Sequence, residues 1–331
     1  PDKNGMLASQ AIFAAIKNLT SDDLVIALVC GGGSALLPAP PINMTLQDEI
    51  TLNKILLSSG LPISKMNLIR KHVSEIKGGK LALACFPAKV ISLVLSDVPG
   101  DELHQVASGP TLADQSRRAE ALSEVRLHKL VLPTNIISHL KSSMADCPLP
   151  TDLERLGHEV YMIGSAHQSL LAAKLKAEES GLNAFILSDA IEGEARDIGN
   201  VHAAIANQIT RYAHPFERPI VLFSGGETTV TLSDSVGRGG RNTEFLLSFL
   251  LGLKVSAYAL AADTDGIDGS EKNAGAYCDA NTLRKIMGKG LNPRELLLNH
   301  NAYLAFEAAD SLFFTGTTGT NVNDFRAILI P

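Results

Sequence analysis

The stretch of residues 219–245, PIVLFSGGETTVTLSDSVGRGGRNTEF, constrains the fold of this chain more than any other part of it. Its apolar run at 220–223 is too short for a helix and unbroken enough to be a strand buried on both faces. A second apolar run, at 245–251, reads as a buried helix. A strand, a glycine-rich turn and a helix in this order predict an α/β domain in which backbone N–H groups of the turn converge on an anion.

The turns in this stretch carry residue types that suit a phosphate or a carboxylate. Two arginines supply fixed positive charge beside the glycines. The alternative is a pair of tight turns with solvated arginines, but the short spacing between the two turns and the helix start favours the anion site. The predicted phosphate-facing residues are Gly225, Gly226, Glu227, Gly237, Gly239, Gly240, Arg241 and Asn242. We expect Arg238 to point elsewhere, because one short turn cannot direct both arginine side chains to the same phosphate.

The first half of the chain repeats this arrangement. Apolar runs at 24–30 and 90–95 predict two buried strands, which end in a Gly-Gly-Gly-Ser turn at 31–34 and in Ser96 and Asp97. Acidic side chains just past the carboxyl end of a buried strand lie where open α/β sheets bind ligands. Because both halves contribute such loops, we expect an active site in a cleft between two α/β domains.

A basic cluster lies between these two strands, in a chain whose net charge is −6. It contains Arg70, Lys71, His72, Lys77 and Lys80. A Gly-Gly pair at 78–79 interrupts it, and each glycine inside a helix costs about 1 kcal/mol relative to alanine. We therefore predict a helix–turn–helix that directs Lys77 and Lys80 at an anion. The alternative is a solvated basic face with a loop.

Length and residue order predict two domains, 1–150 and 151–331, joined near the Pro-rich segment 146–150. The second half restarts with a strand at 160–163, a helix at 167–180 and a strand at 185–187, which predict a βαβ unit. A further strand at 255–262 leads into Asp265 and Asp268, and the chain finishes with a helix at 302–309, a short strand at 311–314 and a Thr/Gly-rich loop.

Composition excludes several function classes. The acidic net charge argues against a nucleic-acid-binding surface, and no apolar run reaches the roughly 18 residues of a membrane span. The four cysteines are far apart and form no C-x-x-C pair, which argues against a zinc site or a disulfide framework. We expect a small-molecule substrate and neither nucleic acid nor a membrane as partner.

The predicted lining suits phosphoryl transfer, which needs backbone N–H donors, arginines and lysines, and aspartates for a metal or a substrate hydroxyl. The sequence contains neither a P-loop nor the protein-kinase motif set, and it lacks a Gly-x-Gly-x-x-Gly dinucleotide fingerprint.

Eight segments in order along nearly the whole chain resemble the glycerate 2-kinases of the MOFRL type. They are CGGGSALLPAP (30–40), NLIRKHVSEIKGGKLA (67–82), SDVPGD (96–101), ASGPT (107–111), SGGETTV (224–230), GRGGRN (237–242), TDGIDG (264–269) and TGTTGTNVND (315–324). The resemblance implies a Rossmann-like N-terminal domain and a dissimilar C-terminal α/β domain with the MOFRL region at about 218–326. It also implies phosphorylation of D-glycerate by ATP to 2-phosphoglycerate, with Mg²⁺ or another divalent cation.

The resemblance also implies roles for particular residues. Asp97 would act as base for the glycerate hydroxyl or orient it, and Arg241 would neutralise charge on the transferred phosphoryl group. The implied substrate-binding residues are Gly32, Gly33, Ser34, Arg70, Lys71 and Lys80. Thr317 and Asn321 join the nucleotide-binding residues, and Asp265 and Asp268 are the candidate metal ligands.

This chain departs from the family in two places. The family has a further N-terminal segment with a catalytic lysine, and the sequence given begins after it, so we expect such a segment to precede Pro1. Thr243 stands before Glu244 where the family has glutamine, a change for which we expect a small effect. The alternatives to a glycerate kinase are a hydroxypyruvate reductase that uses NAD(P)H and a non-catalytic module that binds phosphorylated metabolites. We expect a cytoplasmic protein, with a mitochondrial location and homo-oligomer formation left open.

Overall fold

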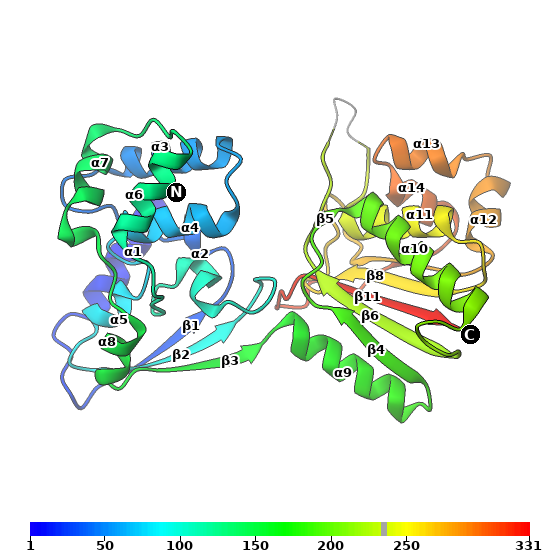
Figure 1. The fold of residues 1–331 in the computed structure, drawn as a ribbon, viewed down its shortest axis with the longest axis horizontal. Helices are drawn as coiled ribbons and strands as arrows, with labels where there is room; N and C mark the ends of the chain where they lie inside the picture. Colours follow the sequence, from blue (N-terminus) through cyan, green and yellow to red (C-terminus); the bar gives the residue numbers. More distant parts are fainter. Residues whose placement is uncertain (233–236) are drawn as a thin grey trace. The chain divides into compact units, whose positions relative to one another are not determined.

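The computed structural model describes residues 1–232 and 237–331; residues 233–236 of the glycine-rich stretch lie outside it. The chain forms two compact units, Pro1–Ile163 and Gly164–Pro331 (Figure 1). Each unit combines helices with a sheet, so the predicted α/β class with two dissimilar domains is confirmed. No helix among the described residues is long and apolar enough to cross a membrane.

The first unit contains a three-stranded sheet in the order β1-β2-β3. Its strands are β1 (Leu24–Val29), β2 (Lys89–Leu95) and β3 (Glu159–Gly164), and β1 pairs with β2 in parallel. The sequence predicts that β1 is buried on both faces, but Leu24, Ile26 and Leu28 are 54%, 59% and 76% exposed. This prediction is wrong because β1 lies at the edge of the sheet with one face uncovered.

Short helices pack around this sheet and form a core of their own. Thr45 begins α3 as predicted: its Oγ1 accepts from the Asp48 N–H at 3.2 Å, and the Asp48 carboxylate accepts from the Thr45 N–H at 2.7 Å. Leu52, Ile69 and Ile136 are fully buried among α3, α4 and α7. The helical elements are α1 (Lys3–Ala15), α2 (Gly33–Leu36), α3 (Leu46–Ser58), α4 (Ile63–His72), α5 (Lys80–Ala84), the 3₁₀ helix η1 (Leu103–Ser108), α6 (Arg118–Leu127), α7 (Thr134–Lys141), the 3₁₀ helix η2 (Ser143–Ala145) and α8 (Pro150–Arg155).

The basic cluster does form a helix–turn–helix, since the Gly-Gly pair separates α4 from α5. Its lysines, however, are internal. Lys77 is 1% exposed, and its Nζ donates to the Leu37 carbonyl at 2.9 Å and pairs with Glu49 at 3.2 Å. Burial lowers the pKa of Lys77, and the charge of Glu49 opposes that shift. The prediction that Lys77 meets an external anion is therefore wrong, and so is the alternative of a solvated face.

The two units divide between Ile163 and Gly164, whereas the sequence analysis placed the division at 150/151. The difference arises because α8 and β3 stay with the first unit: Leu153 packs in its core and β3 completes its sheet. For the same reason 160–187 is not a βαβ unit, since β3 belongs to the first sheet and β4 to the second.

The second unit is built on a six-stranded sheet in the order β10-β9-β8-β11-β6-β4, and β5 pairs with β7 beside it. Its strands are β4 (Asn183–Ser188), β5 (Gly193–Glu194), β6 (Ile220–Gly226), β7 (Thr228–Thr229), β8 (Tyr258–Asp263), β9 (Gly275–Cys278), β10 (Leu312–Phe313) and β11 (Asp324–Ile330). Every residue of β6 is buried, which confirms the predicted central strand. The sequence analysis assigned no strand to 324–330, yet β11 pairs antiparallel with both β6 and β8.

Helices cover both faces of this sheet (Figure 1). The long α10 and α11 pack on one face through Ala203, Phe245 and Phe249, and α9 packs on the other through Leu170. The helices are α9 (Ala166–Glu179), α10 (Ala195–Tyr212), α11 (Arg241–Gly252), α12 (Thr282–Gly288), α13 (Pro293–Leu298) and α14 (Ala302–Ala308). The strand register sets Gly226 and Asp263 on either side of Asp324, so β6, β8 and β11 bring their polar ends to one edge.

Candidate active site

A cavity of about 740 Å³ opens at this edge of the second unit. The first turn of α11 supplies Arg241 to its wall, and the end of β8 supplies Asp263. The predicted residues that line the cavity are Glu227, Gly237, Gly239, Gly240, Arg241, Asp265 and Asn321.

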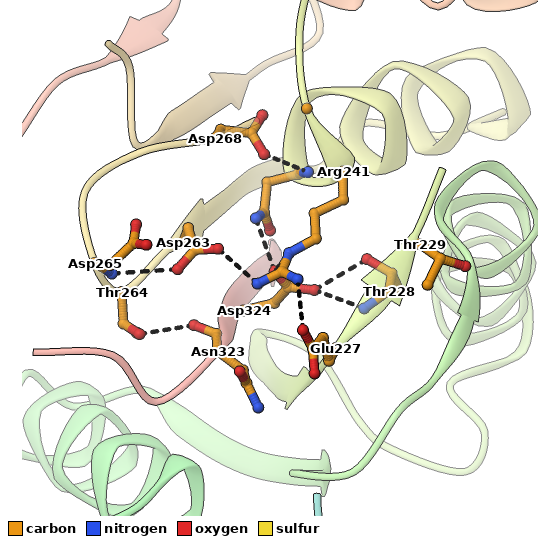
Figure 2. A network of polar contacts seen from close by, with 12 residues as sticks. Glu227, Thr228, Thr229, Arg241, Asp263, Thr264, Asp265, Asp268, Asn323 and Asp324 are labelled. Carbon is orange, nitrogen blue, oxygen red and sulfur yellow. Dashed lines mark hydrogen bonds and ion pairs between the residues drawn. The ribbon is translucent and has the colours of Figure 1, made fainter. Parts of the chain in front are cut away.

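Arg241 is held by three carboxylates, as Figure 2 shows. Its Nη1 pairs with Glu227 at 3.1 Å, its Nη2 with Asp263 at 2.6 Å and its Nε with Asp324 at 2.7 Å. Burial disfavours the charged guanidinium, but the carboxylates outweigh this effect and raise the pKa of Arg241. The cavity therefore has a permanently charged and oriented guanidinium in its wall.

Asp263 was not among the predicted site residues, although it ends a predicted strand. Its side chain is 6% exposed. Burial raises the pKa of Asp263 to about 6, and the charge of Arg241 opposes that rise. The neighbouring carboxylates of Asp265 and Asp324 contribute to this raised pKa.

Asp324 lies beneath the cavity and fixes the structure around it. Its Oδ2 accepts from the Thr228 N–H at 3.0 Å and from the Thr228 hydroxyl at 2.9 Å. Its Oδ1 accepts from the Asn242 amide at 2.9 Å. Asn242 is fully buried and its side chain supports Asp324, so its predicted nucleotide contact stays a prediction for its backbone.

Asp268 caps α11 and does not face the cavity. Its two carboxylate oxygens accept from the backbone N–H groups of Asn242 and Thr243, both at 2.8 Å. Burial raises the pKa of this fully buried carboxyl to about 6. No group of three His, Cys, Asp or Glu side chains in the described part of the chain is arranged to hold a metal ion. The prediction that Asp265 and Asp268 share a cation is therefore not supported.

The glycines of the two turns are required by close packing. A Cβ on Gly226, whose φ is +120°, would lie 2.3 Å from the Ile191 backbone nitrogen. A Cβ on Gly240 would lie 2.4 Å from the Asp268 backbone. Gly225 accepts the Ile191 N–H at 3.1 Å, which ties the strand end down. Thr317 is exposed and is not among the residues that line the cavity, so its nucleotide contact stays a prediction.

Arg238 shares none of the three carboxylate partners of Arg241. Its guanidinium forms two 3.0 Å hydrogen bonds to Glu271 and lies 4.4 Å from the centre of the Tyr303 ring.

Sequence reasoning missed Glu244 and His300, which also line the cavity. His300 Nδ1 lies 2.9 Å from Glu244 Oε2, and Arg196 pairs with the other Glu244 oxygen at 3.1 Å. Glu244 lies one turn of α11 beyond Arg241, a spacing that could have pointed to it. His300 follows α13 in a segment without a motif, so no signal marked it.

The first unit brings Asp97 to the Gly-Gly-Gly turn, as predicted. A Cβ on Gly31 would lie 1.6 Å from an Asp97 carboxylate oxygen, so the carboxylate rests directly on that glycine. Gly32 has a φ of +80° and precedes α2, whose first turn contains Gly33 and Ser34. The structure thus places the turn and the carboxylate together at the neighbouring ends of the parallel strands β1 and β2.

A polar chain links this turn to Arg70. The Ser34 hydroxyl lies 2.6 Å from the Ser108 hydroxyl, which donates to Asn67 Oδ1 at 3.2 Å. Arg70 Nη1 donates to the same oxygen at 3.1 Å. Burial lowers the pKa of Arg70, with the charge of Glu49 opposing it.

Lys71 and Lys80 do not join this chain of hydrogen bonds, and their substrate contacts stay a prediction. Lys71 is 1% exposed and pairs with Asp114 at 2.6 Å. Burial opposes the effect, but hydrogen bonds from Lys71 and Ser116 lower the pKa of Asp114 to about 2. Lys80 donates to the Ser74 carbonyl at 2.6 Å. Both ammonium groups are thus committed to internal partners.

Several known proteins are similar to this chain over its whole length. Residues 220–324 match the MOFRL family, and residues 1–141 match a domain of unknown function, DUF4147. A protein of Agrobacterium vitis, named for a suggested hydroxypyruvate reductase activity, is 47% identical over 100% of this chain and 86% of its own length. A glycerate 2-kinase of Pyrococcus horikoshii is 36% identical over 100% of this chain and 76% of its own. The crystal structure of a glycerate kinase of Thermotoga maritima superimposes with a TM-score of 0.90, at 34% identity over 100% of this chain and 78% of that one.

Proposed function

This chain belongs to the MOFRL family of glycerate 2-kinases, and we propose that it transfers the γ-phosphoryl group of ATP to the 2-hydroxyl of D-glycerate. The observation that carries this proposal is the guanidinium of Arg241, which three carboxylates orient in the wall of a cavity of about 740 Å³. Phosphoryl transfer depends on such fixed positive charge, because negative charge shifts between phosphate oxygens as the bond breaks.

The nucleotide phosphates would bind in the second unit. Gly239 and Gly240 line the cavity immediately before α11, so the positive end of this helix faces it. Nη1 is the side of the Arg241 guanidinium at which one partner can replace another, because its present partner, the Glu227 side chain, is 48% exposed. An incoming phosphate oxygen would compete with Glu227 at this edge.

Glycerate would bind at the strand end of the first unit. Asp97 rests on Gly31 at this end and is half-buried, which suits a carboxylate that accepts the proton of a substrate hydroxyl. The backbone of Gly32 and Gly33 and the hydroxyl of Ser34 would hold substrate oxygens. Arg70 is the remaining basic residue of the predicted set at this end and would pair with the glycerate carboxylate.

A divalent cation carried with ATP needs only one or two protein carboxylates, because phosphate oxygens and water fill its other positions. Asp265 fits this requirement: it lines the cavity, and its Oδ1 accepts the Ile267 N–H at 2.7 Å. When bound, the cation would neutralise charge on the β- and γ-phosphate oxygens.

A reductase is the second candidate, because the Agrobacterium relative carries that name. A coupled assay of ADP release in the full-length protein separates the candidates. We expect ATP consumption that requires D-glycerate and a product phosphorylated at the 2-position. NADH oxidation with hydroxypyruvate and no ADP release would establish the reductase instead. Binding of nucleotide without either turnover would indicate a non-catalytic module.

A further inference from the structure

Arg326 is a charged side chain inside the apolar layer of the second unit. It is fully buried on β11, on the face that also carries Ile328 and Ile330. Its guanidinium lies 4.9 Å from the centre of the Phe245 ring. Burial lowers the pKa of Arg326, and the charge of Asp324 opposes this shift. Burying a guanidinium costs free energy even when it is paired, so an apolar residue would suit packing alone better.

The ion pair and hydrogen bonds of Arg326 lead toward the cavity edge. Its Nη2 pairs with Asp324 Oδ2 and donates to the Thr228 hydroxyl at 3.0 Å. Its Nη1 donates to the Gly225 carbonyl at 3.3 Å, at the end of β6. Arg326 therefore links the end of β6 to Asp324 on β11, and Asp324 is a partner of Arg241.

Asp324 joins the two arginines through its separate oxygens. Oδ2 receives Arg326 and Thr228, whereas Oδ1 receives Arg241 Nε at 2.7 Å. Because Arg326 and Thr228 hold Oδ2, the plane of the Asp324 carboxylate is fixed, and Oδ1 faces Arg241 in one orientation. The three side chains form a continuous line from the core to the cavity.

The charge balance gives Arg326 a further reason to be present. Strand register puts Asp263 directly beside Asp324, so two buried carboxylates share this edge. Arg241 and Arg326 together balance them. His202 does not supply that charge, because burial lowers the pKa of this histidine to about 4, although its hydrogen bond to the Ile198 carbonyl opposes the shift.

We propose that Arg326 is a positioning residue for phosphoryl transfer: it fixes the carboxylate of Asp324, which in turn fixes the guanidinium of Arg241. The expected effect on kcat rests on the proposed function, whereas the expected effect on the orientation of the Arg241 guanidinium does not.

The first test replaces Arg326 in the full-length enzyme with methionine and lysine. A small displacement of a group that stabilises the transition state can cost about 10²-fold in rate, so we expect kcat of Arg326→Met to fall by roughly 10- to 100-fold. KM for ATP should change less than about 3-fold, because the affected contact acts in the transition state. Arg326→Lys keeps the charge and should recover part of the rate. Arg238→Met, which removes a paired arginine of the same unit, is the matched control and should keep wild-type kcat.

The second test asks whether Arg326 acts through Asp324. In a double-mutant cycle with Asp324→Asn, the double variant should lose no more kcat than Asp324→Asn alone. Multiplication of the two losses would overturn the proposal, because it would show that Arg326 acts by an independent route.

The third test needs no turnover. The ¹⁵N signal of the Arg241 Nε–H group should shift, and its exchange with water should accelerate, in Arg326→Met and not in Arg238→Met. An unchanged Arg241 signal in folded Arg326→Met would overturn the proposal even if the enzyme is active. If the Arg241 signal changes but the protein lacks glycerate kinase activity, the positioning role of Arg326 stands and the proposed function is wrong. If Arg326→Met does not fold, Arg326→Lys is read by the same signal.

Discussion

Arg241 carries one positive charge and contacts three carboxylates, which differ in how firmly they are fixed. The side chains of Asp324 and Asp263 are 0% and 6% exposed, whereas that of Glu227 is 48% exposed. Two buried carboxylates therefore set the plane of the guanidinium, and the third occupies its solvent side. Arg241 can therefore keep its orientation when another partner replaces Glu227 at Nη1.

Arg241→Ala and Arg241→Lys should both fold and lose most of the rate. We expect kcat to fall about 10³-fold or more for alanine, the effect typical of an arginine that neutralises a transferred phosphoryl group. Lysine keeps the charge but cannot contact Asp324, Asp263 and a phosphate at once, so it should bind ATP and still lose most of the rate. Steady-state kinetics with D-glycerate and ATP measures both.

Arg238→Ala is the control for that series, because Arg238 is occupied by Glu271 and the Tyr303 ring. It should be mild in kcat/KM. A larger loss for Arg238→Ala than for Arg241→Ala, with both variants folded by circular dichroism, would show that the roles of the two arginines are reversed.

Asp97→Asn should lower kcat by about 10²- to 10⁴-fold with little change in KM for ATP, as expected for a general base or an orienting carboxylate. Asp101→Asn is a matched control in the same loop: Asp101 has a φ of +56°, a conformation that asparagine also adopts, so this variant should keep wild-type activity. Retention of more than about half of the wild-type kcat in Asp97→Asn would reduce Asp97 to a turn residue.

The lysines show where residue-level prediction from sequence stops. Basic residue types beside glycines suggested an anion contact for Lys77, and the family resemblance implied one for Lys71, but each is buried against an acidic partner. Those partners, Asp114 and Glu49, are 43 and 28 positions away along the chain. Such pairing is set by tertiary structure, and the sequence carries no local sign of it. The places of Asp97 and Arg241 could be predicted because Asp97 follows a buried strand and Arg241 stands at the start of a helix. Both patterns are local in the sequence.

Helix α11 begins where the site requires it because Asp268, from another loop, caps its first turn. Asp268→Ala should therefore destabilise the protein by about 1–3 kcal/mol, through the lost cap and two buried N–H groups left without an acceptor. Chemical denaturation of the full-length protein measures this loss. A variant of wild-type stability that needs more Mg²⁺ for activity would favour the metal role instead.

The pH dependence of Asp268 gives the same assignment a second test. The pKa of this carboxyl is raised in the folded protein to about 6, from 3.8. The folded state therefore holds its proton more tightly, and the stability that Asp268 contributes is full below 3.8 and falls as pH rises through 6. We expect the stability of wild type relative to Asp268→Asn to decrease between pH 4 and pH 6. An increase over that range would contradict the raised pKa.

Element types were predicted best where the apolar pattern is strong and local. The unbroken run of β6 and the buried helix α11 were both identified, because few other structures can bury such runs. The strand β11 was missed, since Arg326 interrupts its apolar face and is buried there through partners such as Asp324 and Thr228, which the local sequence pattern does not reveal. The exposure of β1 could not be predicted either, because strand order depends on the whole sheet.

Each unit has a core of its own and contains one of the two strand-end sites. The core of the second unit surrounds α11, and a smaller core of the first unit surrounds Val29, Val94 and Ala107 beside the Gly-Gly-Gly turn. If ATP binds one unit and glycerate the other, each ligand should therefore stabilise only the unit that it binds. A ligand that binds only the folded form of a unit slows every opening of that unit.

Hydrogen exchange in the full-length protein should therefore separate the two ligands. ADP at about 100 times its Kd should slow amides that exchange through opening of a unit by about 100-fold. We expect this effect in β6, whose residues are all buried, and not in β2 of the first unit. D-Glycerate should protect β2 and leave β6 unchanged. Arg241→Ala should abolish the effect of ADP on β6 without altering the effect of glycerate on β2, because Arg241 lines only the cavity of the second unit. Protection of β2 by ADP, with β6 unaffected, would exchange the two assignments.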